Sequence, residues 1–267
     1  MRRPLKDIQC FLLDMDGTFY LDDQLLQGAL HFIDTITKLG RRYIFLTNNS
    51  SRHRGYYAEK ITRLGLAVQE SQIFTSGEAT ALHLNSESPG ARVYVVGTEF
   101  LQEEFNQHGF TLDEGNPQLV VLGFDTSLTY AKLWKLCDFV RAGLPYIATH
   151  PDLNCPTEGG FMPDIGAMMA FVQTSTGRQP DKVIGKPNRA IIDELAKKIQ
   201  VPMEQLAMIG DRLYTDIALG ETTGITTILV LSGETRRSDL ETSPHKPDYI
   251  FEHLGELAAY LTRSIQG

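Results

Sequence analysis

The sequence has few cysteines, and their placement offers neither crosslinks nor a zinc site. Three occur in 267 residues, Cys10, Cys137 and Cys155, and they lie far apart with no C-x-x-C spacing. This distribution excludes a disulfide framework and fits a reducing compartment. We therefore predict a cytoplasmic protein.

An excess of positive charge and a long apolar run are also missing. The formal net charge is −8, so the far field of the protein repels nucleic acid and gives no reason to expect binding to anionic lipid. Apolar runs such as 225–231 are far shorter than the roughly 20 residues that span a bilayer. The basic start, residues 1–6, leads into a short strand-like run rather than a signal peptide. We expect neither a nucleic-acid partner nor a membrane partner.

The chain does contain the alternating pattern of an α/β protein. Short apolar runs alternate with helical patterns in two stretches, 8–13, 30–39, 43–46 and 56–64, then 182–184, 189–199, 206–209, 214–220 and 226–231. This βαβα order implies parallel strands with helices on both faces, and the strands are apolar almost throughout, as strands buried on two sides are. We predict a Rossmann-like, doubly wound parallel-sheet core.

A second α/β stretch lies in the middle of the chain, and it could extend the same sheet or form a smaller domain of its own. Turn-like segments at 86–90 and 175–180 lie near its ends. The length of 267 residues also suits a core with a second domain. We therefore predict a catalytic core of residues 1–80 and 178–267 with an inserted α/β cap of residues 81–177.

Two carboxylates follow the first strand, in Leu12-Leu13-Asp14-Met15-Asp16-Gly17-Thr18. If the chain turns at Gly17, both can face one crevice, where one carboxylate attacks phosphorus and the other, kept protonated, donates to the leaving oxygen. An ordinary Asp-Gly turn is the plain alternative. The Asp-x-Asp of metal-dependent glycosyltransferases is a serious rival, whereas an EF-hand fits poorly because its glycine stands sixth in a loop between helices.

Donors suited to phosphate follow two other strand-like runs. Thr47 and Asn48 end one run and offer hydroxyl and amide groups, although a polar loop that caps the next helix explains them as well. Lys186, in Ile184-Gly185-Lys186-Pro187, could neutralise a phosphoryl group, although a solvated surface lysine is the commoner case.

A further acidic pair follows the run 206–209, in Gly210-Asp211-Arg212-Leu213-Tyr214-Thr215-Asp216. Asp211 can complete an oxygen site for Mg²⁺, with Asp216 bracing the loop, or it can simply cap a helix. Asp14, Thr47, Lys186 and Asp211 each stand at the carboxyl end of a strand-like run. Such ends share one edge of an open parallel sheet, so we expect the four side chains to converge there.

Together these segments resemble the four motifs of the haloacid dehalogenase superfamily of phosphatases, and the long insertion resembles the cap of its NagD-like, nitrophenylphosphatase branch. The motifs are Asp14-x-Asp16-Gly17-Thr18, Thr47-Asn48-Asn49, Lys186 and Gly210-Asp211-x₄-Asp216. The resemblance implies the nucleophile Asp14, the acid/base Asp16, phosphate ligands Thr47 and Lys186 with Asn48 beside them, and Mg²⁺ on Asp14, the Asp16 carbonyl and Asp211. The second carboxylate argues against the dehalogenases themselves, which lack that acid/base.

The segment from Thr149 to Gly166 is similar to the substrate-facing loop of that branch. Within it we single out His150, Asp152 and Asp164 as candidate specificity residues. His150 stands where the branch commonly has Asn, and Asp164 where it frequently has Gly. His150 and His53 are expected to be surface or loop histidines, because this mechanism requires no histidine base.

The sequence thus predicts a Mg²⁺-dependent hydrolase of small phosphomonoesters that works through a phospho-aspartate on Asp14. Two other classes stay open, a glycosyl or phosphoryl transferase that uses the same Asp-x-Asp, and a non-catalytic phosphate sensor. The expected partner is a small phosphorylated metabolite. A homodimer formed through the cap stays open as well.

Overall fold

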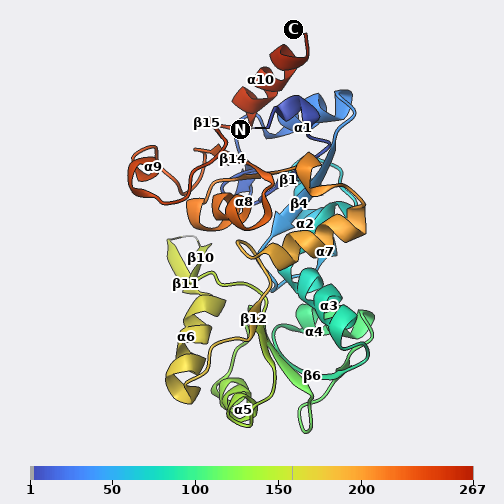
Figure 1. Cartoon of the computed structure of the whole chain (residues 1–267), viewed down its shortest axis with the longest axis vertical. Helices are drawn as coiled ribbons and strands as arrows, with labels where there is room; N and C mark the ends of the chain where they lie inside the picture. Colours follow the sequence, from blue (N-terminus) through green and yellow to red (C-terminus); the bar gives the residue numbers. More distant parts are fainter. Residues whose placement is uncertain (1–2, 158, 267) are drawn as a thin grey trace. The chain divides into compact units, whose positions relative to one another are not determined.

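The computed structural model describes residues 3–157 and 159–266, which form two compact units (Figure 1). The first unit holds the described residues up to Thr47, then Tyr57–Phe74 and the chain from Leu195 onward. The second holds Asn48–Tyr56 and Thr75–Glu194. The predicted cap, residues 81–177, lies wholly in the second unit, which also takes in 48–56, 75–80 and 178–194.

The first unit is built on a sheet with the strand order β15-β14-β13-β1-β4-β5. Its strands are β1 (Cys10–Leu13), β4 (Arg42–Thr47), β5 (Ile73–Thr75), β13 (Leu206–Gly210), β14 (Thr226–Val230) and β15 (Tyr249–Phe251). The neighbours from β15 to β4 pair in parallel. Leu13 pairs with Ile209 on one side and with Phe45 on the other. The chain therefore leaves β1, β4 and β13 at the same edge of this sheet.

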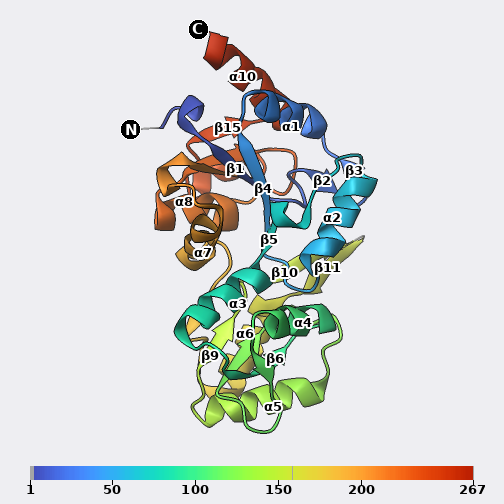
Figure 2. The same ribbon diagram turned by 90° about the vertical axis from the view of Figure 1, so that its right-hand side faces the viewer.

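Apolar side chains cover both faces of this sheet, as the unbroken apolar strands predict. In β14, Ile228 and Val230 join the large core beneath α1 (Ala29–Lys38) and α10 (Leu254–Gln266), whereas Leu229 packs on the opposite face beside Ile217. α1 and α10 lie side by side (Figures 1 and 2). The doubly wound fold is thus confirmed.

The first unit also holds the hairpin β2 (Tyr20–Leu21) and β3 (Gln24–Leu25), the helices α8 (Ala218–Thr223) and α9 (Asp239–Thr242), three 3-10 turns (Leu5–Asp7, Glu70–Gln72 and Met203–Gln205) and a π-helical turn (Leu213–Ile217). The helices α2 (Arg54–Arg63) and α7 (Arg189–Ile199) each have residues in both units. None of the helices among the described residues has the length and apolar character needed to cross a bilayer.

The second unit has its own parallel sheet, with the order β12-β9-β8-β6-β7. Its strands are β6 (Arg92–Val96), β7 (Thr111–Leu112), β8 (Leu119–Leu122), β9 (Tyr146–Ala148) and β12 (Lys182–Val183), and its helices are α3 (Ser76–Glu87), α4 (Glu99–Gln107), α5 (Tyr130–Arg141) and α6 (Ile165–Thr176). An antiparallel pair, β10 (Asn154–Thr157) and β11 (Gly160–Pro163), precedes α6. α5 and α6 pack together over a core that includes Val120, Leu122 and Val172 (Figure 1).

One strand lies in a different sheet from the one expected. β12, which leads to Lys186, pairs with β9 in the second sheet, with Lys182 beside Ile147 and Val183 beside Ala148. The sequence placed it in the core sheet because the apolar run 182–184 opens a regular βαβ series. A run this short carries no information about its pairing partner. The ends of β1, β4 and β13 share one sheet edge, but the strand that precedes Lys186 does not belong to that sheet.

Candidate functional site

Three carboxylates of the first unit form a compact group at the ends of β1 and β13. Asp14, Asp211 and Asp216 each offer an oxygen, and these oxygens lie within 4.8 Å of one another. Asp14 is half-buried, whereas Asp211 and Asp216 are buried. Carboxylate oxygens in this number and spacing suit a hard divalent cation. Thr47 ends β4 at the same sheet edge and is buried.

The Asp211 carboxylate is held by donors and by closely packed glycines. Its Oδ1 accepts the Thr18 hydroxyl at 3.3 Å, and its Oδ2 accepts the backbone N–H of Glu234 at 2.7 Å. A Cβ atom would lie 2.4 Å from Oδ2 if placed on Gly17 and 2.0 Å if placed on Gly233. Gly17 also has a φ of 85°, which favours glycine. These contacts fix the direction of the Asp211 carboxylate.

Asp216 accepts a hydrogen bond in the turn that follows β13. It lies in the π-helical turn Leu213–Ile217 and is fully buried. Its Oδ2 accepts the backbone N–H of Arg212 at 3.2 Å, which closes the loop that carries Asp211. Single π-helical turns of this kind are frequent at functional sites. The bracing role of Asp216 stays a prediction.

The carboxylates of this group repel one another. Burial, and then the charges of Asp14 and Asp216, raise the pKa of Asp211 well above its usual range. Two unit charges 4 Å apart interact by about 4 kcal/mol at an effective dielectric of 20. A divalent cation held by these oxygens would remove that repulsion, so the residues present fit a metal ion.

Asp16 differs from this group in its surroundings. Crowding by protein atoms raises the pKa of its carboxyl to about 6, with Lys60 opposing the shift and Asp14 adding to it. The side chain nevertheless keeps exposed surface. Arg212 is close enough to lower that pKa, and its Nε lies 3.0 Å from Glu234 Oε2. The side chain of Asp16 is thus partly desolvated yet open to water, a setting that suits a group exchanging protons.

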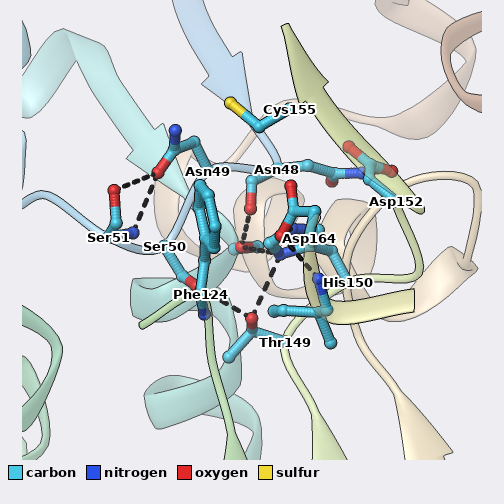
Figure 3. Close-up of polar contacts among 12 residues, drawn as sticks. Asn48, Asn49, Ser50, Ser51, Phe124, Thr149, His150, Asp152, Cys155 and Asp164 are labelled. Atoms are coloured by element: carbon cyan, nitrogen blue, oxygen red, sulfur yellow. Dashed lines mark hydrogen bonds and ion pairs between the residues drawn. The ribbon is translucent and has the colours of Figure 1, made fainter. Parts of the chain in front are cut away.

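The second unit holds Asn48 and Lys186 together. The Asn48 Nδ2 donates to the carbonyl oxygen of Lys186 at 2.9 Å, and its Oδ1 accepts the backbone N–H of Lys186 at 2.8 Å. Nδ2 also donates to Asp152 Oδ1 at 3.0 Å. Lys186 is only 2% exposed, so it is not a solvated surface lysine. Asn48 and Asp152 are labelled in Figure 3.

His150 lies in the loop after β9, as one of the two expectations had it, but it is buried inside this unit rather than at the surface. Its ring is fully buried, and Nε2 lies 3.0 Å from Asp164 Oδ1. Asp164 also caps α6 by accepting the Ile165 N–H at 2.6 Å. The sequence missed this burial because His150 follows the short strand β9 in a segment of loop-like composition. His53 is exposed, as expected, with its ring 5.0 Å from that of Phe100.

His150, Asp152 and Asp164 also form a group whose ligand atoms lie within 4.8 Å of one another. The His150–Asp164 contact and the Asn48–Asp152 hydrogen bond already engage these atoms (Figure 3). The group is thus part of a hydrogen-bonded network.

The structure therefore brings the predicted residues together in two sets. Asp14, Asp16, Thr47, Asp211 and Asp216 belong to the first unit, whereas Asn48, His150, Asp152, Asp164 and Lys186 belong to the second. Sequence reasoning missed three participants: Gly233, which admits Asp211, Ser76, which contacts Asn48, and Arg212, which lies among the acids. Arg212 lies within the motif Gly210–Asp216 and is the only basic residue in it, so the sequence could have indicated its place beside the acids. Nothing in the sequence around Gly233 or Ser76 indicates that either residue takes part in the site.

Comparison with known proteins gives a consistent picture over nearly the whole chain. The family model described as haloacid dehalogenase-like hydrolase matches residues 11–111, and one described as HAD-hydrolase-like matches residues 183–257. The 5'-nucleotidase YutF of Bacillus subtilis is 34% identical to this chain, and the matched region spans 96% of this chain and 100% of YutF. The acid sugar phosphatase of Staphylococcus saprophyticus is also 34% identical, covering 97% and 100%. The crystal structure of 4-nitrophenylphosphatase from Thermotoga maritima has a TM-score of 0.93 at 49% identity, covering 96% and 98%.

Proposed function

Because the chain belongs to the haloacid dehalogenase-like hydrolases, we propose that it hydrolyses small phosphomonoesters through nucleophilic attack by Asp14. It is a phosphatase, since the relatives that match it end to end are a 5'-nucleotidase, an acid sugar phosphatase and a 4-nitrophenylphosphatase. The observation that carries the assignment to Asp14 is its position. It follows the central strand β1 and lies within 4.8 Å of the buried acids Asp211 and Asp216.

In this proposal the Asp14 carboxylate attacks phosphorus, and the bond from phosphorus to the ester oxygen breaks. Asp16 gives its proton to the departing oxygen and then takes one from the water that hydrolyses the phospho-aspartate. The motif supports the Asp16 role, and so does its partly desolvated carboxyl. Thr47 and Lys186 keep the phosphate-binding roles that the family resemblance implies, and Asn48 keeps its place beside them.

Phosphatases of this family depend on a metal ion, and we propose Mg²⁺ for this chain. Asp14 and Asp211 would hold it together with the carbonyl of Asp16, and Asp216 would brace the loop. A bound divalent cation supplies charge stabilisation to the phosphoryl oxygens. The all-oxygen donor set favours a hard cation over zinc.

The two alternatives are set aside on the same observations. A glycosyltransferase with a metal-binding Asp-x-Asp would need an acceptor site, whereas the relatives that match the whole chain are phosphatases. A phosphate sensor would have no need of both Asp14 and Asp16, which this chain keeps.

The residues of the chain also suggest a class of substrate and a cellular compartment. We propose a small phosphorylated metabolite, such as a sugar phosphate or nucleoside monophosphate, with His150, Asp152 and Asp164 in the part of the second unit that would set preference. None of the three cysteines forms a disulfide among the described residues, which supports a reducing, cytoplasmic setting. We also propose a homodimer formed through the cap, which a measurement of the oligomeric state in solution would test.

The test is phosphate release from p-nitrophenyl phosphate and a panel of metabolite monoesters, with Mg²⁺ and with a chelator. We expect release that needs the metal and disappears in Asp14→Asn. Asp138→Asn, which removes an exposed carboxylate of α5, is the matched control and should release phosphate at the unmodified rate. Full turnover by Asp14→Asn would remove that residue from the mechanism.

A further inference from the structure

A chain of polar contacts runs through the second unit from the start of α6 to the backbone of Lys186. It begins at Asp164, whose Oδ1 lies 3.0 Å from His150 Nε2. On the other side of the ring, Nδ1 lies 3.1 Å from the Thr149 hydroxyl and 3.4 Å from the Ser76 hydroxyl. Ser76 donates in turn to the carbonyl oxygen of Asn48. Figure 3 shows Asn48, Thr149, His150 and Asp164 in this arrangement.

Asn48 contacts the backbone of Lys186 through both the oxygen and the nitrogen of its side-chain amide. Its Oδ1 accepts the Lys186 N–H and its Nδ2 donates to the Lys186 carbonyl, while the second Nδ2 hydrogen goes to Asp152. Turning the amide over would place like groups opposite each other at these contacts. The N–H and the carbonyl of Lys186 are therefore both hydrogen-bonded to the Asn48 side chain, and the Asn48 carbonyl accepts from Ser76.

His150 also packs directly against the loop that carries Lys186. A Cβ atom on Gly185 would lie 2.6 Å from His150 Cβ, 2.7 Å from Asn48 Oδ1 and 2.8 Å from the Thr149 carbonyl oxygen. The Gly185 N–H donates to that carbonyl at 2.8 Å. Only glycine allows this approach, so the loop that carries Lys186 packs directly on the His150 Cβ, the Asn48 amide and the Thr149 carbonyl.

The hydrogens in this network can be assigned without a conflict when His150 carries its proton on Nε2. The Phe124 N–H donates to Ser50 Oγ at 2.9 Å, and the Ser50 and Thr149 hydroxyls lie 3.0 Å apart. Ser50 then donates to Thr149, Thr149 donates to His150 Nδ1, and Nε2–H donates to Asp164. The Ser76 hydroxyl gives its hydrogen to the Asn48 carbonyl oxygen, so its 3.4 Å approach to Nδ1 is a packing contact rather than a hydrogen bond. The hydrogen-bonded groups form one buried network, and such networks hold a single geometry.

From these contacts we infer that His150, oriented by Asp164, is a positioning residue that fixes Asn48 and, through it, the backbone of Lys186. This inference rests on the proposed role of Lys186 as a phosphate ligand. His150 touches no substrate in this scheme. It keeps the lysine ammonium at a set place, as a bound phosphoryl group requires.

The test is a double-mutant cycle between His150→Gln and Lys186→Ala. Alone, His150→Gln should lower kcat/KM by roughly 10- to 100-fold, and by the same factor for p-nitrophenyl phosphate and a sugar phosphate, because a misplaced phosphate ligand affects every ester alike. In the Lys186→Ala background the same change should cost less than about twofold. An equal loss in both backgrounds would overturn the inference, and so would a loss confined to one ester.

Ser76→Ala provides a second route, because it removes the hydroxyl that lies against His150 Nδ1 and donates to the Asn48 carbonyl oxygen. It should lower kcat/KM for both esters in the same direction. The matched control is Thr80→Val, which removes another buried hydroxyl of α3, bonded to the Ser76 carbonyl at 2.7 Å, and leaves Asn48 untouched. Equal losses in Ser76→Ala and Thr80→Val would mean that general damage to α3, and not the loss of these two contacts, is responsible.

Calorimetric binding of orthophosphate separates this inference from the proposed function. Lys186→Ala and His150→Gln should each weaken orthophosphate binding, and the double variant should bind no more weakly than Lys186→Ala. That result stands whether or not Asp14→Asn abolishes turnover, which tests the reaction itself. Unchanged orthophosphate affinity in His150→Gln would overturn the positioning role even if the enzyme proves to be a phosphatase as proposed.

Discussion

Asp216 lies so close to Gly210 that a Cβ atom on residue 210 would fall 2.2 Å from the Asp216 carboxyl carbon. Gly210 is the last residue of β13, and Asp216 holds the following loop by accepting the Arg212 N–H. Asp211 stands between them in sequence and belongs to the same carboxylate group. The glycine is therefore needed for the packing of the carboxylates on the strand end.

Gly210→Ala should accordingly destabilise the protein and impair its activity. The new methyl group cannot be accommodated without displacing the buried Asp216, and forced overpacking costs about 1 to 3 kcal/mol. Denaturant unfolding measures the first effect and kcat/KM for p-nitrophenyl phosphate the second. Gly115→Ala is the control, since its Cβ would meet only Asp113 Oδ1 at 3.6 Å. If both variants behave alike, the close approach at residue 210 is not structurally important.

Much of the first unit could be predicted because its pattern is local. Apolar runs of four to six residues give β1, β4, β13 and β14, and the helical periods between them give α1 and α7. The chain leaves buried parallel strands at one sheet edge, so the sequence alone predicts that Asp14 and Asp211 lie at the same edge.

A divalent cation should stabilise the native protein through these acids. Binding to the folded state alone adds RT ln(1 + [L]/Kd), about 2.7 kcal/mol at a cation concentration of 100 Kd, which corresponds to several degrees in Tm. Thermal unfolding with increasing MgCl₂ should show this rise in the wild type and lose it in Asp211→Asn. Asp138→Asn removes the same charge from an exposed position and should keep the rise. A rise of equal size in Asp211→Asn would place the cation elsewhere.

The three cysteines should differ sharply in reactivity. Burial raises the pKa of the Cys10 thiol to about 12, and the attraction of Arg42 offsets only part of that shift. Since a raised pKa keeps the thiol protonated, Cys10 carries almost no thiolate at pH 8. Cys137 is buried as well, whereas Cys155 is half-buried on β10. Iodoacetamide at pH 8 should therefore modify Cys155 alone in the native protein and all three in guanidinium, as peptide mass mapping will show. Rapid native labelling of Cys10 would contradict its burial.

Relations across long sequence separations could not be predicted, and His150 shows why. Its burial depends on Asp164 from the start of α6, on Ser76 from α3 and on Gly185 from the lysine loop. Nothing within a few residues of His150 records those neighbours. The pairing of β12 with β9 was hidden for the same reason, since Lys182–Val183 is too short to show which sheet it joins.

Asp16→Asn should stop the reaction after its first step when the leaving group is good. p-Nitrophenolate departs without protonation, so the variant still forms the phospho-aspartate on Asp14, but it lacks the base for hydrolysis. Loss of general acid–base catalysis typically costs 10²- to 10⁴-fold. Rapid mixing should show a burst of p-nitrophenolate equal to the enzyme concentration, followed by slow turnover, and intact-mass spectrometry should detect the phosphorylated chain.

The leaving group separates the two roles that Asp16 has in this scheme. With an alkyl phosphate the first step itself needs a proton donor, so Asp16→Asn should give no burst and no accumulated phosphoenzyme. Asp14→Asn should give no burst with either ester, because it lacks the attacking oxygen. Steady turnover of both esters by Asp16→Asn at the wild-type rate would show that water or another group moves these protons. A burst that persists in Asp14→Asn would instead transfer the nucleophile to a different residue.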